Sequence, residues 1–191
     1  MSVHQYLLET IPSFRRAQVR LEHWTGSKMR ANALARTGVT VIPTVVHVLW
    51  STAAENISDA QVESQIAALN RDFRAQNVDR AKVASIWRGL VADSRIEFEL
   101  ATIDPAGKKT IGVTRTQTTR RMFSTDDAMK RTRSGGRDPW ATDRYLNIWV
   151  CALGGGLLGY AQFPGGPKAT DGVVILNTAF GTRGTARAPF N

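Results

Sequence analysis

The stretch Val39-Thr-Val-Ile-Pro-Thr-Val-Val-His-Val-Leu-Trp50 decides the fold class of this chain. Its residues are mostly β-branched or otherwise apolar, and apolar side chains fall on both faces of the extended backbone. That pattern is typical of a central strand in a sheet that is covered on both sides. Pro43 cannot donate a backbone hydrogen bond, which suits a position near the start of a strand. We therefore predict a central, doubly covered strand over residues 39–50.

An amphipathic helix follows this strand. Ser58 and Gln61 form a capping box, and Ile57 is placed to contact Val62 as a hydrophobic staple. Apolar residues then recur at i, i+4, i+7 and i+11, which puts them on one helical face. These residues are Val62, Ile66, Leu69 and Phe73. The pattern predicts a helix that begins near Ser58 and covers the sheet.

Shorter apolar or alternating runs predict five further strands. Their ranges are 96–100, 112–118, 145–150, 158–163 and 172–176. The polar and basic stretch 119–144 is expected to be loop, with a short helix near 126–131, and Gly154-Gly-Gly156 is expected to be a turn. Strand, helix, two strands, loop and three strands make an α/β or α+β sheet with at least one covering helix.

The N-terminal residues 3–36 are predicted to form a helical appendage and a linker. Apolar residues recur there at i, i+3, i+7 and i+10, which is helical spacing. They are Phe14, Ala17, Leu21 and Trp24. We expect Gly26 to end the helix and residues 27–36, which are small, polar and basic, to form the linker.

Length, composition and charge narrow the range of functions that this chain could have. A length of 191 residues fits one domain with an appendage, and 42% hydrophobic with 21% charged residues is ordinary for a soluble globular protein. No apolar run approaches the ~20 residues that span a bilayer. The net charge of +9 favours acidic partners, but the basic residues are spread thinly and lack interleaved aromatics, so we expect no nucleic-acid partner. No secretory signal precedes Thr10, so either the protein stays inside the cell or its true N-terminus lies further upstream.

Few residues offer catalytic chemistry. His4, His23 and His47 include no pair at the i, i+4 spacing with which one helix face holds a metal. We expect His47 to be a buried strand histidine with one hydrogen bond, and the other two to be solvated. The single cysteine, Cys151, excludes an internal disulfide and is expected to fill the core. Asp126 and Asp127 could bind a cation, although a role at a helix N-terminus explains them equally well.

Several stretches resemble one family. They are Asn56-Ile-Ser-Asp-Ala-Gln61 with Leu69-Asn-Arg-Asp-Phe-Arg74, Ile96-Glu-Phe98, Gly112-Val-Thr-Arg-Thr116, Tyr145-Leu-Asn-Ile-Trp-Val-Cys151, Leu158-Gly-Tyr-Ala-Gln-Phe-Pro-Gly-Gly-Pro167 and Thr170-Asp-Gly-Val-Val-Ile175. In this order they resemble the pappalysin (ulilysin-like) zinc metalloproteases of the metzincin clan. The resemblance runs from about residue 3 to residue 191.

The resemblance implies a metzincin-like upper subdomain, with a mixed twisted sheet of about five strands and a covering helix. Residues 1–36 would be a pro-segment-like helical region and linker, and residues 37–191 the N-terminal (upper) subdomain of the catalytic domain. In the family a zinc-binding helix with the pattern His-Glu-x-x-His follows the stretch that resembles Ala188–Asn191, and Asn191 suits its N-cap. The resemblance therefore places the zinc ligands and the general base outside these 191 residues, so that no catalytic or metal-binding residue is assigned within them.

By the same resemblance, residues 158–164 are the upper-rim strand that pairs with extended substrate. The implied substrate-binding residues are Leu158, Gly159, Tyr160, Ala161 and Gln162. Zinc is the implied cofactor, with calcium left open as a second one. The implied partners are a protein or peptide substrate and the missing C-terminal half of the catalytic domain. Relatives are typically secreted, but the localisation of this chain stays open.

The function implied is that of the N-terminal part of a zinc metalloendopeptidase, inactive as an isolated chain. The alternatives are a non-catalytic module that binds peptides along the 158–164 edge and, as a third class, a basic nucleic-acid binder. In the resembled fold the zinc-binding helix packs on the same sheet face as the first helix. Without it, we expect a bare apolar strip near Val45 and Ile96.

Overall fold

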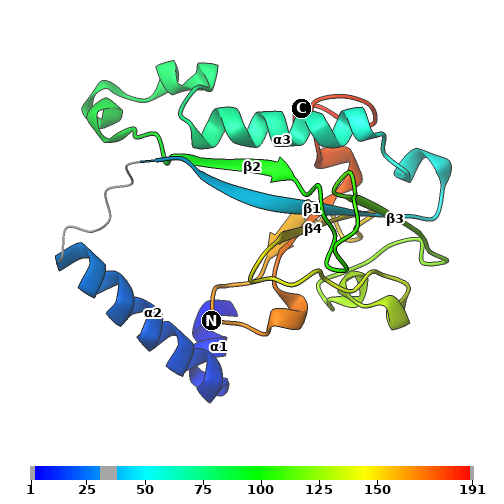
Figure 1. The fold of residues 1–191 in the computed structure, drawn as a ribbon, viewed down its shortest axis with the longest axis horizontal. Coiled ribbons are helices and arrows are strands. Elements are labelled where there is room, and N and C mark those ends of the chain that lie inside the picture. Colours follow the sequence, from blue (N-terminus) through cyan, green and yellow to red (C-terminus); the bar gives the residue numbers. More distant parts are fainter. Residues whose placement is uncertain (1–2, 31–37, 190–191) are drawn as a thin grey trace.

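Figure 1 shows the computed structural model, which describes residues 3–30 and 38–189. One sheet forms the body, α3 covers one side of it, and α1 and α2 lie on the other side (Figure 1). The helices are α1 (Val3–Thr10), α2 (Pro12–Arg30) and α3 (Asp59–Phe73). The strands are β1 (Thr40–Trp50), β2 (Ile96–Leu100), β3 (Val113–Gln117), β4 (Leu146–Cys151), β5 (Gly159–Ala161) and β6 (Val173–Leu176). The predicted mixed α/β fold is confirmed.

β1 is the central strand, as its sequence predicted. The strand order is β2-β1-β4-β6-β5, and β3 also pairs with β1. Residues 40–44 of β1 pair with β2 and residues 46–50 pair with β3, both in parallel, while β4 pairs in parallel along residues 44–48. β4 and β6 are parallel, and only β5 runs antiparallel to its neighbour, β6. The sheet is therefore mixed, and its single antiparallel strand lies at one edge.

α3 begins as the capping residues predict and is fixed to the sheet. The Ser58 hydroxyl accepts a hydrogen bond from the Gln61 backbone N–H at 3.2 Å. The Gln61 side chain does not return to the cap as a capping box requires; it donates to the carbonyls of Asn177 and Phe180 instead. Val62 and Ile66 are buried, and Ile57 joins Val62 in the same apolar cluster. Leu69 is half-buried, and the expected burial of Phe73 is wrong, because its ring packs against Phe98 of the edge strand β2 and otherwise remains exposed.

Alternation along β1 divides its side chains between the two sides of the sheet. Val46 and Val48 pack with Val62 of α3. On the opposite side, Leu49 joins a cluster built around Trp149 that the 119–144 loop covers. Apolar clusters therefore lie on both sides of the sheet, which confirms the doubly covered strand.

The bare apolar strip expected near Val45 is wrong at that residue. Val45 is fully buried and packs with Ala101 and Trp140, because the loop between β3 and β4 closes over it, and Ile96 is half-buried. Half-buried apolar residues border the α3-side cluster instead. They are Trp50, Leu100, Val113, Leu146 and Ile175.

Two further local predictions need correction. The short helix expected near 126–131 is a 3-10 turn, Ala128–Lys130, followed by a second one at Thr132–Ser134. α2 continues through Gly26 to Arg30, because one glycine inside a helix costs only about 1 kcal/mol. Residues 27–30 of the predicted linker are therefore helical, and its residues 31–36 lie outside the described part of the chain. No helix within residues 3–30 and 38–189 is long and apolar enough to cross a membrane.

Candidate peptide-binding edge

β5 lies at the edge of the sheet, antiparallel to β6, as predicted for residues 158–163, although the strand itself spans only Gly159–Ala161. The Leu158 carbonyl accepts from the Leu176 N–H at 2.8 Å, and the Gln162 N–H donates to the Gly172 carbonyl at 3.5 Å. Residues bonded to a neighbour alternate along an antiparallel strand, so Tyr160 also bonds toward β6. The N–H and C=O groups of Gly159 and Ala161 therefore point away from β6, toward the open edge.

Glycine at position 159 is required by the close approach of the two strands. A Cβ atom there would lie 2.5 Å from the Val174 carbonyl oxygen, well inside van der Waals contact. Any larger residue would push β5 away from β6 and change the direction of the outward backbone groups.

The side chains of Tyr160 and Gln162 project to the same side of β5 and are engaged within the protein. The Tyr160 hydroxyl donates to Asp127 Oδ1 at 2.8 Å and lies 3.2 Å from Met129 Sδ. Burial first, and then the Asp127 carboxylate, raise the pKa of Tyr160. Gln162 donates to the Pro167 carbonyl at 3.1 Å and accepts from the Thr170 hydroxyl at 2.5 Å. A peptide would therefore meet the backbone of β5 and the exposed side chain of Leu158.

Lys130 is a buried charged residue that the sequence did not single out. It stands in the basic stretch Lys130-Arg-Thr-Arg133, here called the basic cluster, yet it is 1% exposed. Its Nζ donates to Asp127 Oδ1 at 2.9 Å and to the Thr170 carbonyl at 2.6 Å. The same ammonium faces the rings of Tyr160 and Trp149, at 4.9 and 5.6 Å from their centres. The i, i+3 spacing of Asp127 and Lys130 was the one signal in the sequence that could have paired them.

The N-terminal helices contact the end of this edge. The His4 ring lies 4.8 Å from the Phe163 ring and 5.6 Å from that of Phe14. Gln18 donates to the Pro164 carbonyl. The expectation that His4 is solvated is wrong, because α1 folds back along α2 and carries its ring between the two phenylalanines; His23 is exposed as predicted.

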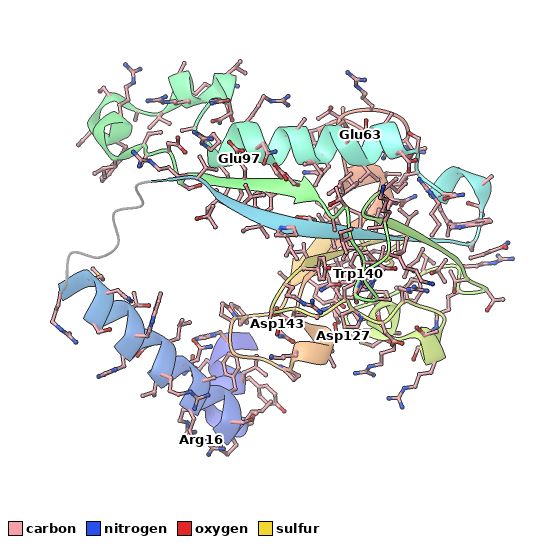
Figure 2. The ribbon with its side chains drawn as sticks, viewed as in Figure 1. Arg16, Glu63, Glu97, Asp127, Trp140 and Asp143 are labelled. Atoms are coloured by element: carbon pink, nitrogen blue, oxygen red, sulfur yellow. The ribbon has the colours of Figure 1, made fainter. Side chains whose placement is uncertain are left out.

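A cavity of about 610 Å³ separates the helices from the edge. Leu7 and Phe14 line it from the helical side, and Lys130, Tyr160 and Gln162 line it from the body. Asp127 also lines the cavity, and Figure 2 shows it on the side of the sheet opposite α3. The helices thus lie over the Tyr160 side of β5 without filling the space beside it.

His47 is buried in β1 as predicted, with two hydrogen bonds rather than one. Asn147 Oδ1, 3.0 Å from His47 Nε2, already accepts from the Trp140 N–H, so Nε2 carries the proton. Nδ1 then accepts from the Thr114 hydroxyl at 2.7 Å. Burial, reinforced by the charge of Arg137 and opposed by the Asn147 hydrogen bond, lowers the pKa of His47 from 6.5 to about 4. The ring is therefore neutral near pH 7 and joins β1, β3 and β4.

The described residues do not fit a zinc site. Across residues 3–30 and 38–189, no three His, Cys, Asp or Glu side chains are grouped so that they could hold a metal. Asp127 is ion-paired to Lys130, which disfavours the cation site considered for Asp126 and Asp127. Cys151 fills the core as predicted, and burial raises its pKa to about 12, which suppresses the thiolate.

Similarity to known proteins was found among solved structures. No family model and no curated protein matches the chain. A mutant of Tannerella forsythia promirolysin is 42% identical, with a TM-score of 0.81, over 98% of this chain and 62% of that chain. Mature mirolysin of the same organism, in complex with a cleaved peptide, is 48% identical, with a TM-score of 0.79, over 82% of this chain and 59% of that one. Mirolysin in complex with compound 9 is also 48% identical, with a TM-score of 0.78, over 81% and 59%.

Mirolysin is a metalloprotease of the metzincin type. The matched portion therefore identifies the fold of this chain as metzincin-like and preceded by a pro-segment, as predicted. The chain spans about three-fifths of the length of the mirolysin chains that it matches.

Proposed function

We propose that this chain, a relative of metzincin-type metalloproteases, is the N-terminal part of a zinc metalloendopeptidase of the pappalysin (ulilysin-like) family. Residues 1–36 are its pro-segment and linker, and residues 37–191 are the upper subdomain of its catalytic domain. One observation carries the proposal: the sheet ends in an open antiparallel edge at the residues assigned to the substrate-binding rim. The isolated chain is inactive in this proposal.

The division at residue 36 is supported by the comparisons. The match to promirolysin covers 98% of this chain, and the matches to mature mirolysin cover 81–82%. The difference is 16–17% of 191 residues, or about 31–32 residues, close to the length of the proposed pro-segment. α1 and α2 are the helices of this segment.

The edge supplies substrate binding through main-chain contacts. The outward N–H and C=O groups of Gly159 and Ala161 form one short ladder with an extended peptide, which becomes an added strand of the sheet. Such bonds do not depend on the peptide's side chains, which suits an endopeptidase that cleaves within many sequences. The peptide in the complex of mature mirolysin supports a peptide as the ligand.

The proposal assigns the zinc ligands and the general base to residues outside this chain, because the described residues do not fit a metal. The zinc-binding helix would cover the half-buried apolar residues on the α3 side, including Leu146 and Ile175. Calcium as a second cofactor stays a prediction.

A non-catalytic peptide-binding module is the second candidate, and the closed packing of the chain favours it. Val45 is fully buried where we expected bare surface, and α3 holds the 177–187 loop through Gln61. Such a module would use the same 158–164 edge and need no further segment.

Extending the chain at its C-terminus distinguishes the metalloendopeptidase from the binding module. The 191-residue chain and a version continued through the codons that follow Asn191 are each incubated with casein and zinc at neutral pH. We expect cleavage that a chelator abolishes in the extended protein and none in the shorter one. Downstream codons without a His-Glu-x-x-His helix, or an extended protein without cleavage, would favour the binding module.

A further inference from the structure

The edge strand on which the proposed function depends is held mainly from one side. β5 has three residues and one neighbouring strand, and its other edge is open. Short edge strands have few backbone hydrogen bonds to fix their rotation. A peptide pairs well only with backbone groups whose direction is already set, because ordering them on binding weakens affinity. Some other contact must therefore hold the orientation of Gly159 and Ala161.

Asp127 and Lys130 supply that contact from beneath the strand. Asp127 Oδ1 accepts from both the Tyr160 hydroxyl and Lys130 Nζ. Lys130 Nζ also donates to the Thr170 carbonyl, and the Thr170 hydroxyl donates to Gln162. Tyr160 and Gln162 are the residues on either side of Ala161. The network therefore holds the chain immediately before and after a residue whose backbone groups face the open edge.

The base of this network is itself fixed. Asp127 adopts a left-handed backbone conformation, with φ 57°, which is uncommon for a residue other than glycine. Gly136 packs directly on the turn, since a Cβ there would lie 2.1 Å from the Met129 carbonyl oxygen. Arg137 donates its N–H to that carbonyl at 2.9 Å and accepts from Trp149 Nε1 at 2.9 Å. The turn that carries the ion pair is thus bound to the central sheet.

We propose that Asp127 and Lys130 are positioning residues that fix the rotation of β5, and so aim the Gly159 and Ala161 backbone groups at a peptide. This inference rests on the proposed function of the edge. A buried lysine that is paired and hydrogen-bonded holds a single geometry, whereas a surface lysine of the basic cluster would hold none. The pair therefore acts on the peptide through Tyr160 and Gln162 and does not contact it.

The test uses the full 191-residue chain with the variants Asp127→Asn, Lys130→Met, Tyr160→Phe and the double variant Asp127→Asn/Tyr160→Phe. Asp126→Asn is the matched control, because the neighbouring carboxylate is exposed and lies 3.9 Å from Arg120. Amide hydrogen exchange reports the motion of residues 158–163, and the ¹³Cζ signal of Tyr160 reports its hydroxyl. Peptide capture is measured with a fluorescein-labelled casein fragment.

We expect exchange over 158–163 to rise about ten- to hundredfold in Asp127→Asn and Lys130→Met, with β1 and α3 unchanged. The double variant should exchange no faster than Asp127→Asn alone, since both changes weaken the same hydrogen bond between Asp127 and Tyr160. The ¹³Cζ signal of Tyr160 should shift in Asp127→Asn at neutral pH, because its hydroxyl loses a charged acceptor. Exchange that rises equally in β1 and α3, or that stays unchanged at 158–163, would overturn the proposal.

The peptide arm separates this inference from the proposed function. Capture by the wild type that weakens about tenfold or more in Asp127→Asn and Lys130→Met, but not in Asp126→Asn, supports both. Capture that is equally strong in all variants overturns the positioning role while leaving the edge as the binding site. No capture by any of the proteins overturns the edge function and, with it, the role assigned to the pair.

Discussion

α2 and α3 carry the same kind of sequence signal and differ in what it achieves. Each has apolar residues at helical spacing, and each is a helix as predicted. On α3 the first two residues of the stripe are buried against the sheet, with Val62 at 0% and Ile66 at 8% exposure, and only the last one, Phe73, is exposed, at 39%. On α2 Phe14 is buried, but Leu21 remains 41% and Trp24 56% exposed. Apolar residues at helical spacing therefore predict the helix, whereas their burial requires another element to pack against them, and the helix sequence does not specify that element.

α3 also makes more side-chain hydrogen bonds to distant residues than α2 does. The Gln61 side chain of α3 makes hydrogen bonds to three distant residues, Asn177, Phe180 and Thr185, and Gln65 accepts from the Gly181 N–H. Among the described residues, α2 reaches the body through a side-chain hydrogen bond from Gln18 to the Pro164 carbonyl and through the close approach of Ala17 to Gly165. α3 should therefore open only when the whole domain unfolds, and α1–α2 should open locally.

Among the substitutions considered, Gln61→Leu on α3 should cause the largest loss of stability. The change leaves the buried carbonyls of Asn177 and Phe180 without their donor, at about 1–3 kcal/mol for each unsatisfied group. We expect a loss of about 2–6 kcal/mol in the free energy of unfolding, measured with urea. Trypsin should also cleave faster at Arg183 and Arg187, which are exposed in the released loop.

Gln76, which is exposed just beyond α3, gives the matched control Gln76→Leu, which should be neutral within about 0.5 kcal/mol. Unchanged stability of Gln61→Leu, together with unchanged tryptic cleavage, would show that α3 does not hold the 177–187 loop.

A second prediction compares equivalent apolar truncations on the two helices. Ile66→Ala removes buried methyl and methylene groups from α3 and should cost about 2–5 kcal/mol, because a cavity remains in the core. Urea unfolding of this variant and of Leu21→Ala measures the contrast. Equal losses in the two variants would mean that α2 is packed as firmly as α3, against the exposure described.

Much of the fold was predictable because the signals are local. The central position of β1 follows from apolar residues on both faces of residues 39–50, and the start of α3 follows from Ser58. The extension of α2 past Gly26 was not predictable, because the cost of one glycine is small beside the packing of the whole helix. The strip expected near Val45 failed because residues far along the chain, Ala101 and Trp140, close over it.

The candidate site was less accessible from the sequence. The edge position of 158–163 came from the family resemblance, since nothing in that stretch distinguishes an edge from an inner strand, and the structure confirms it. Its substrate-binding role stays a proposal. The burial of Lys130 was not predictable, because it depends on Thr170, forty positions away, and on the ring of Tyr160. A network assembled from separate loops leaves no periodic pattern.

The third prediction uses protonation to separate the body from the N-terminal segment. The pKa of His47 is lowered from 6.5 to about 4, so below pH 6.5 the unfolded chain binds a proton that the folded chain excludes. Stability should be unaffected above pH 6.5 and should fall as the pH drops toward 4. The contribution reaches about 3 kcal/mol, at 1.36 kcal/mol for each unit of pKa.

The measurement is urea unfolding from pH 7.5 to pH 4, with His47→Gln and with His23→Gln as the exposed matched control. We expect the pH dependence between 6.5 and 4 to flatten in His47→Gln and to persist in His23→Gln. Equal slopes in wild type and His47→Gln would refute the assignment of a neutral buried His47.

The smallest effect on the stability of this chain is expected for a substitution on α2. Trp24 is more than half exposed on α2, so Trp24→Ala should change the stability of the 191-residue chain by no more than about 0.5 kcal/mol. In the proposed function, however, a further part of the protein follows this chain, and the exposed residues of the α2 stripe are free to contact it. If that part buries Trp24, the same substitution should cost about 3–5 kcal/mol in an extended protein. Urea unfolding of both proteins, with Arg20→Ala as an exposed control on the same helix, measures the difference. A neutral effect in both lengths would leave the stripe without a partner and remove one reason to regard α2 as part of a pro-segment.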